Sequence, residues 1–170
     1  MNDNAQPLTR HEAELMRTDA DIQRRFIASY ELMLDFFGIT LTDAHSGSLA
    51  RAQHFQSRYA HLNASFHNYL RVTRILKSLG IVGLEHLKEQ FVRFMVHEVF
   101  EHHMLPNTEQ SLVRFWIPTC RRLEYVRQMD ALVLKLSNGR RRVDREGPDG
   151  WGDEAHGEPN WATRLYDQKR

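Results

Sequence analysis

SFHNYLRVTRILKSLGIVGLEHLKEQFVRFMVHEVF, residues 65–100, is the stretch that decides the fold class. In its first half apolar residues recur at steps of three and four, which is the spacing of one helical face. Gly80 and Gly83 interrupt that pattern, and the run that follows is apolar over more than half of a helical circumference. The stretch therefore predicts one helix over residues 66–79 and a second, central helix over residues 84–103.

Upstream of this stretch the chain predicts three further helices. Thr9 begins the spacing of a capping box, so a short first helix is expected to start there. Thr18 is expected to cap a second helix, whose apolar stripe covers residues 22–37 and which ends at Gly38, a residue suited to a left-handed C-cap. A third helix is expected over residues 49–62. No segment shows the alternating pattern of a β-strand.

Downstream, a last helix is expected over residues 109–136, kinked or divided at Pro118. Five of the nine glycines then lie beyond Ser137, among isolated apolar residues, so that segment cannot bury enough surface to fold. We therefore expect an all-α bundle of five to six helices over residues 1–136 and a disordered tail over residues 137–170. The tail contains two residues that could dock on a partner or on the helical body, Trp151 and Trp161.

The composition indicates an intracellular globular protein. The net charge is only +1, which lacks the basic excess of a dedicated nucleic-acid binder. No apolar run approaches the roughly 20 residues of a membrane span, and residues 1–10 do not resemble a signal peptide. These features favour a cytoplasmic protein with peripheral membrane contact at most. Its single cysteine, Cys120, is expected to be a structural thiol, although Arg121 and Arg122 beside it could lower its pKa.

Two stripes of basic residues are the main candidates for a binding site. On a helical wheel, His67, Arg71, Arg74 and Ser78 gather opposite the apolar arc of residues 66–79, and a second stripe on the third expected helix comprises Arg51, His54, Arg58 and His61. If the two helices pack against each other, the stripes border one groove whose guanidinium groups suit carboxylate or phosphate. The alternative is a solvated surface joined by local ion pairs. Asn68 falls inside the apolar arc, where its amide needs partners.

The segment HEVFEHH, residues 97–103, is the densest cluster of potential metal ligands. It is a near miss for the zinc-protease pattern, because a glutamate stands where the second histidine belongs. Glu98 and His102 are four residues apart, and an internal hydrogen-bonded pair is favoured over surface histidines and over a metal or acid/base site. No second Glu-x-x-His segment with supporting carboxylates is evident. We therefore expect no metal ligands, no cofactor and no catalytic residue.

GSLARAQHFQSRYAHLNASFHNYLRVTRILKSLGIVGLE, residues 47–85, resembles the conserved region of the opioid growth factor receptor family. The preceding YELMLDFFGITL, residues 30–41, resembles it too. The flanking segments AQPLT, FVRF and LP extend the resemblance over roughly residues 5–130. The run HNYLRVTRILKSLG is the most distinctive of these segments.

The resemblance implies a receptor-like protein. Animal members are described as receptors for the opioid peptide Met-enkephalin at the nucleus and its surroundings, where they restrain cell proliferation, and they are unrelated to the seven-helix opioid receptors. This implies a nuclear or perinuclear location in a eukaryote. Similar domains also occur as short proteins outside animals, which this compact chain resembles. The family pattern falls on Arg51, Asn63, His67, Asn68, Arg71, Arg74 and Gly80.

Residues and resemblance together predict a non-enzymatic binding domain that takes a peptide, an acidic protein segment or another anion. The expected ligand-binding residues are Arg51, Arg58, His67, Asn68, Arg71 and Arg74. Nucleic-acid binding through the same arginines and Arg140–Arg142 is a second hypothesis. A metal-dependent hydrolase at Glu98 and His102 is a third. A purely structural role in a dimer interface is a fourth.

Overall fold

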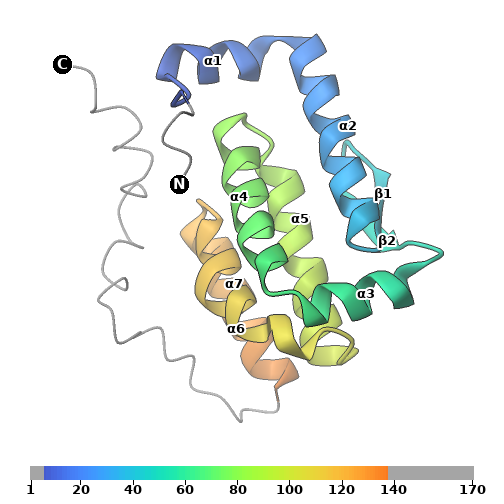
Figure 1. The fold of residues 1–170 in the computed structure, drawn as a ribbon. Helices are drawn as coiled ribbons and strands as arrows, with labels where there is room; N and C mark the ends of the chain where they lie inside the picture. The colour runs from blue at the N-terminus through green and yellow to red at the C-terminus, as the bar shows by residue number, and fades with distance from the viewer. Residues whose placement is uncertain (1–5, 138–170) are drawn as a thin grey trace.

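A computed structural model describes residues 6–137 and confirms a mainly helical fold (Figure 1). Its α-helices are α1 (Arg10–Thr18), α2 (Ala20–Phe36), α3 (Phe55–Ala64), α4 (His67–Ile81), α5 (Glu85–Val96), α6 (Glu109–Ser111) and α7 (Leu123–Leu136). Short π-helical segments are η1 (His97–Glu101) and η3 (Leu112–Trp116), and short 3-10 segments are η2 (Pro106–Thr108) and η4 (Ile117–Thr119). The expected tail beyond Ser137, with Trp151 and Trp161, lies outside the described residues.

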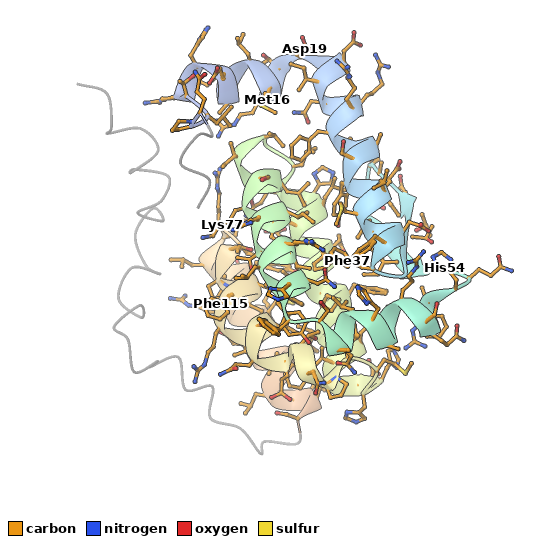
Figure 2. The ribbon with its side chains drawn as sticks, in the orientation of Figure 1. Met16, Asp19, Phe37, His54, Lys77 and Phe115 are labelled. Carbon is orange, nitrogen blue, oxygen red and sulfur yellow. The ribbon has the colours of Figure 1, made fainter. Side chains whose placement is uncertain are left out.

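The first two helices meet at a corner whose capping residue differs from the prediction. The capping box at Thr9 is confirmed, with Thr9 accepting from the Glu12 N–H and the Glu12 carboxylate accepting from the Thr9 N–H. Thr18, however, closes α1 by donating its hydroxyl to the Glu14 carbonyl. Asp19, at the corner in Figure 2, caps α2 because its carboxylate accepts from the first free N–H groups of that helix.

The all-α class is confirmed, but one short pair of strands that the sequence did not indicate lies between α2 and α3. There β1 (Ile39–Asp43) and β2 (Ser48–Arg51) form an antiparallel hairpin, so the third helix begins at Phe55 rather than at residue 49. The β-branched residues of ITLT favour extended backbone, and the Asp43 carboxylate accepts from the N–H groups of His45 and Ser46 in the turn. Strands this short show too few alternations for a period to be recognised.

The fold is built around α5, as expected for a helix that is apolar over more than half of its circumference. Leu87, Val92 and Met95 are fully buried, and α5 packs against α4, α7, β2 and η3. Trp116 is also fully buried and donates its indole N–H to the Tyr69 carbonyl of α4. The described residues include no helix with the length and apolar character of a bilayer crossing.

The expected fifth and last helices are both interrupted. The fifth changes to π-helical geometry at His97–Glu101 and ends before His103, which has a φ of 54°. Pro118 divides the last helix as predicted, because it lies in η4, after which Cys120 is extended. Gly80 does not stop α4 as expected. It lies inside the helix, where a Cβ would come 2.7 Å from the Lys88 ammonium nitrogen.

Cys120 is a buried structural thiol, 5 % exposed. Burial raises the pKa of the Cys120 thiol to about 12, although the Lys88 ammonium nearby acts in the opposite direction. Because only the thiolate attacks disulfides, we expect Cys120 to react with Ellman's reagent at pH 8 at least about tenfold more slowly in the folded protein than in concentrated urea. A thiol that reacts equally fast in both states would contradict this assignment.

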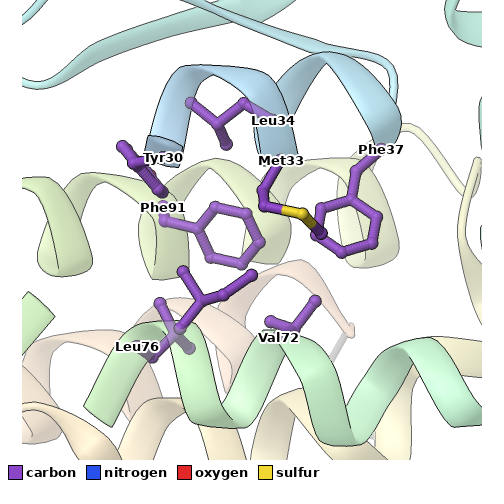
Figure 3. Close-up of a pocket in the computed structure, with 8 residues that line it drawn as sticks. Tyr30, Met33, Leu34, Phe37, Val72, Leu76 and Phe91 are labelled. Atoms are coloured by element: carbon purple, nitrogen blue, oxygen red, sulfur yellow. The ribbon is translucent and has the colours of Figure 1, made fainter. Parts of the chain in front are cut away.

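The void where α2, α4 and α5 meet is too small for a ligand. Figure 3 shows Tyr30, Met33 and Leu34 of α2, with Phe37 just after that helix, facing Phe91 of α5 and Val72 and Leu76 of α4. The space among them is about 10 Å³, which is the least that holds one water molecule. Burial raises the pKa of the Tyr30 hydroxyl, which has no hydrogen-bond partner among residues 6–137. This junction is core and not a site.

Candidate functional site

An open groove lies between α2 and α4, with a volume of about 380 Å³. It is lined by three apolar residues of α2 and by two arginines and one isoleucine of α4: Leu32, Met33, Phe36, Arg71, Arg74 and Ile75. We call it the α2–α4 groove. Residues spaced three and four apart share one helical face, which brings Leu32 and Phe36 together on α2 and Arg71, Arg74 and Ile75 on α4. The site thus combines an apolar floor with two cations.

The two arginines of the groove have no counter-ion among residues 6–137. Both are exposed, and no carboxylate of residues 6–137 lies within ion-pair distance of either guanidinium. Arg71 donates from Nη1 to the Oδ1 atom of Asn68 at 2.9 Å, a neutral acceptor that orients the guanidinium without balancing it. Because a guanidinium presents a rigid fork of donors, this arrangement suits a carboxylate or another oxyanion.

Asn68 is a polar residue in the apolar arc of α4, and its contact with Arg71 explains this position. It is 1 % exposed, and its Oδ1 atom accepts from Arg71. Its Nδ2 atom is also buried and finds no partner within the described part of the chain. Asn68 therefore affects the groove indirectly, because it orients the guanidinium of Arg71. His67, one turn before Arg71 on α4, is exposed and lies against the Phe66 ring at 4.3 Å between centroids.

The α3 residues of the second predicted stripe support α2 instead of facing α4. The His61 ring packs edge-on against Phe36, a floor residue of the groove, at 5.8 Å. His54 Nε2 lies 3.5 Å from the Asp35 carboxylate, and in Figure 2 it lies beside the end of α2. Arg58 is partly buried against Gly38, since a Cβ built on that glycine would lie 2.8 Å from Arg58 Cβ. The groove is therefore found between α2 and α4, and not between α3 and α4.

Arg51 has an internal counter-ion and lies on β2, not on a helix as predicted. Its Nε atom donates to both carboxylate oxygens of Glu98, at 3.0 and 3.1 Å, and its guanidinium lies 5.1 Å from the centre of the Phe55 ring. The Glu98 side chain is 4 % exposed and that of Arg51 is 33 % exposed. Burial, and then the charge of Glu98, raise the pKa of the neighbouring Tyr59 hydroxyl. Arg51 thus anchors the hairpin to η1.

The predicted pair of Glu98 and His102 does not form. Glu98 is committed to Arg51, and His102 is exposed at the end of η1. The nearest equivalent pair is on the surface, where His97 Nδ1 lies 2.5 Å from the Glu101 carboxylate and lowers its pKa. Across residues 6–137 no three His, Cys, Asp or Glu side chains are placed to hold a metal ion. Nothing in this region supports the hydrolase hypothesis.

Two further positions of the family pattern have structural roles. Asn63 joins α3 to η2, because its Oδ1 atom accepts from the Asn107 N–H and its carbonyl accepts from the Asn107 amide. Gly80 leaves room for the buried Lys88 ammonium, which donates to the Thr119 carbonyl at 2.6 Å and pairs with Glu85 at 2.7 Å. Neither position lines the groove.

Sequence reasoning missed the apolar half of the groove. Met33 belongs to the stripe that was expected to be buried, and Leu32 lies beside that stripe. Leu32 is 69 % exposed and lies next to Glu31 and three residues before Asp35. Single exposed leucines are common on protein surfaces, so no strong signal in the sequence marked this half of the groove.

Comparison with known proteins gives one family. The family described as "Opioid growth factor receptor (OGFr) conserved region" matches residues 1–146. The mouse protein named opioid growth factor receptor is 44 % identical over 117 residues, which cover 69 % of this chain and 18 % of the relative. The mouse opioid growth factor receptor-like protein 1 is 45 % identical over 121 residues, covering 71 % of this chain and 26 % of the relative. The chain thus spans about a quarter or less of these relatives. No solved structure matches.

Proposed function

The chain belongs to the family of the opioid growth factor receptor conserved region, and on that premise we propose that it is a non-enzymatic binding domain whose α2–α4 groove captures a peptide. The expected ligand carries one or more carboxylates beside an apolar side chain. One observation carries the proposal: two exposed arginines without a counter-ion among residues 6–137 border an apolar floor. The relatives are named receptors, which supports capture over catalysis.

The chemistry of the groove favours a peptide over a simple anion. A free oxyanion would engage Arg71 and Arg74 but leave the floor of Leu32, Met33 and Phe36 in water. Covering that floor contributes roughly 25 cal/mol per Å² of apolar surface, and hydrogen bonds to charged groups contribute about 1.5–3 kcal/mol each. A ligand that has both an apolar and an anionic group therefore gains more than one that has either alone.

The predicted site residues divide into two roles under this proposal. Arg71 and Arg74 contact the ligand, His67 extends the basic stripe, and Asn68 positions Arg71. Arg51 and Arg58 hold the scaffold, through the ion pair to Glu98 and the contact with Gly38. We infer a cytoplasmic or nuclear protein, in keeping with its lone buried thiol.

The test is a fluorescein-labelled decapeptide with four glutamates, one phenylalanine and one leucine, titrated against the full chain. Replacing both groove arginines, Arg71→Glu and Arg74→Glu, should weaken its binding by at least about 100-fold, because two charge-assisted contacts become repulsive. Leu32→Ser should weaken binding by about fivefold through loss of apolar contact alone. Both effects are read as Kd by fluorescence anisotropy.

The matched control makes the same charge change away from the groove. Arg93→Glu with Arg127→Glu replaces two exposed arginines of α5 and α7 and should leave Kd within about twofold. A peptide with glutamines in place of glutamates should not bind measurably. Equal loss of affinity in the control and groove variants would contradict the proposal, as would unchanged affinity in the groove variant when circular dichroism shows that it is folded.

A further inference from the structure

The chain contains one segment that is both strongly acidic and aromatic. Residues 146–163 read EGPDGWGDEAHGEPNWAT, with five carboxylates, no lysine or arginine, and two tryptophans. This segment has a formal charge of −5, so the rest of the chain carries +6 within the overall +1. Of that +6, residues 138–145 and 164–170 on either side carry +5 and residues 6–137 carry +2, with −1 in residues 1–5, so the acidic charge is concentrated in this segment.

The composition of this segment matches the α2–α4 groove in both of its halves. Trp151 is followed by Asp153 and Glu154, and Trp161 is preceded by Glu158, so each indole has at least one carboxylate within three residues. The groove offers an apolar floor beside Arg71 and Arg74, and its volume of about 380 Å³ suits one aromatic side chain with its flanking backbone. An indole adds a large contact area, and an arginine beside it is attracted to the ring face.

The segment can also reach the groove. Thirteen residues lie between Ser137 and Trp151, and the fourteen steps along the chain allow a span of up to about 45–50 Å at 3.3–3.6 Å per residue. A domain of this size has a radius of gyration of about 14 Å, and thus a diameter of about 36 Å. Attachment to the same chain gives the segment an effective concentration in the millimolar range, so even a contact with a Kd of about 1 mM is half occupied.

We propose that residues 146–163 occupy the α2–α4 groove of their own chain, with a tryptophan on the floor and its neighbouring carboxylates on Arg71 and Arg74. This rests on the proposed function, because it names an internal competitor for the same groove. An external peptide must then displace the segment, which lowers its apparent affinity by the fraction of chains in which the groove is free. The groove is thereby regulated from within the chain.

The experiment follows the indole N–H signals of the uniformly ¹⁵N-labelled full chain by NMR. The chain has three tryptophans, and Trp116, fully buried and bonded to Tyr69, is the internal reference. Trp151→Phe and Trp161→Phe assign the other two signals. We expect at least one of these to differ from its position in the synthetic peptide of residues 146–163. In the Arg71→Glu/Arg74→Glu variant it should move to the peptide position, while Trp116 stays unchanged. The Arg93→Glu/Arg127→Glu control should resemble the wild type.

A second measurement separates this inference from the proposed function. The full chain with Trp151→Ala and Trp161→Ala should bind the acidic decapeptide at least about twofold more tightly than the wild type, because a groove that is half occupied by the segment halves the apparent affinity. If both tail indoles already match the free peptide and the double tryptophan variant gains no affinity, the inference is wrong, whether or not the decapeptide binds. If the indoles respond but the decapeptide never binds, the inference stands and the proposed function fails. Indole shifts that grow with protein concentration would assign the contact to a second copy and overturn it.

Discussion

Replacing Arg51 with alanine is expected to lower the free energy of unfolding by about 3 kcal/mol. The substitution leaves the Glu98 carboxylate buried at 4 % exposure without the guanidinium that donates to both of its oxygens. This loss lies at the lower end of the range for broken buried ion pairs, because the Arg51 side chain is one-third exposed to solvent. Urea denaturation monitored by circular dichroism measures the change, with an unchanged slope if unfolding remains two-state.

The second half of a double-mutant cycle tests whether the ion pair is the cause. When Glu98→Gln is added to Arg51→Ala, it should restore about 2 kcal/mol, since a neutral amide costs less to bury than an unpaired carboxylate. Additive losses from the two substitutions would show that Arg51 acts through other contacts, such as its position over the Phe55 ring. If Arg51→Ala alone lowers the free energy of unfolding by less than about 1 kcal/mol, the ion pair contributes no more than an ordinary exposed pair.

Gly38→Ala is expected to lower the free energy of unfolding by about 3 kcal/mol or more. Gly38 has a φ of +81°, which costs a residue with a side chain about 1–2 kcal/mol. In addition, the new Cβ would lie 2.8 Å from Arg58 Cβ and 3.0 Å from Phe55 Cα, which are not free to move away. The substitution therefore forces α3 away from the end of α2. Thermal and urea unfolding of the full chain measure the loss.

Gly83 is the matched control for this prediction. Its φ of +84° is nearly the same, but the nearest atom to a Cβ there would be in the Arg17 side chain, at 3.5 Å. Gly83→Ala should thus cost only about 1 kcal/mol, the backbone part of the effect. Equal losses at the two glycines would mean that contact between α3 and Gly38 does not matter, and that the position of α3 is set elsewhere.

These two positions link stability to the groove. Gly38 and Arg51 lie at the two ends of the segment that turns the chain from α2 into α3. From α3, His61 packs against Phe36, which is part of the groove floor. A variant that displaces α3 should therefore change the groove even though neither substituted residue lines it. This is the physical reason for placing Arg51 and Arg58 in the scaffold, although sequence reasoning placed them in the site.

The helices, their approximate ends and the central place of α5 followed from the sequence by itself, because apolar periodicity and caps such as Thr9 act within a few residues of the chain. The basic stripe of α4 was likewise visible in the sequence, since Arg71 and Arg74 share one helical face.

The hairpin could not be predicted from the sequence, because two strands of four or five residues are stabilised by pairing with each other and by packing on α5. Only the tertiary structure decided which of these arginines have an internal counter-ion. Arg51 pairs with Glu98 across 47 residues of sequence, whereas within residues 6–137 Arg71 contacts a neutral amide and lies beside the apolar face of α2. No local pattern encodes a partner that far along the chain, and the proposed site depends on a fold that balances one cation internally and leaves two others, among residues 6–137, beside an apolar floor.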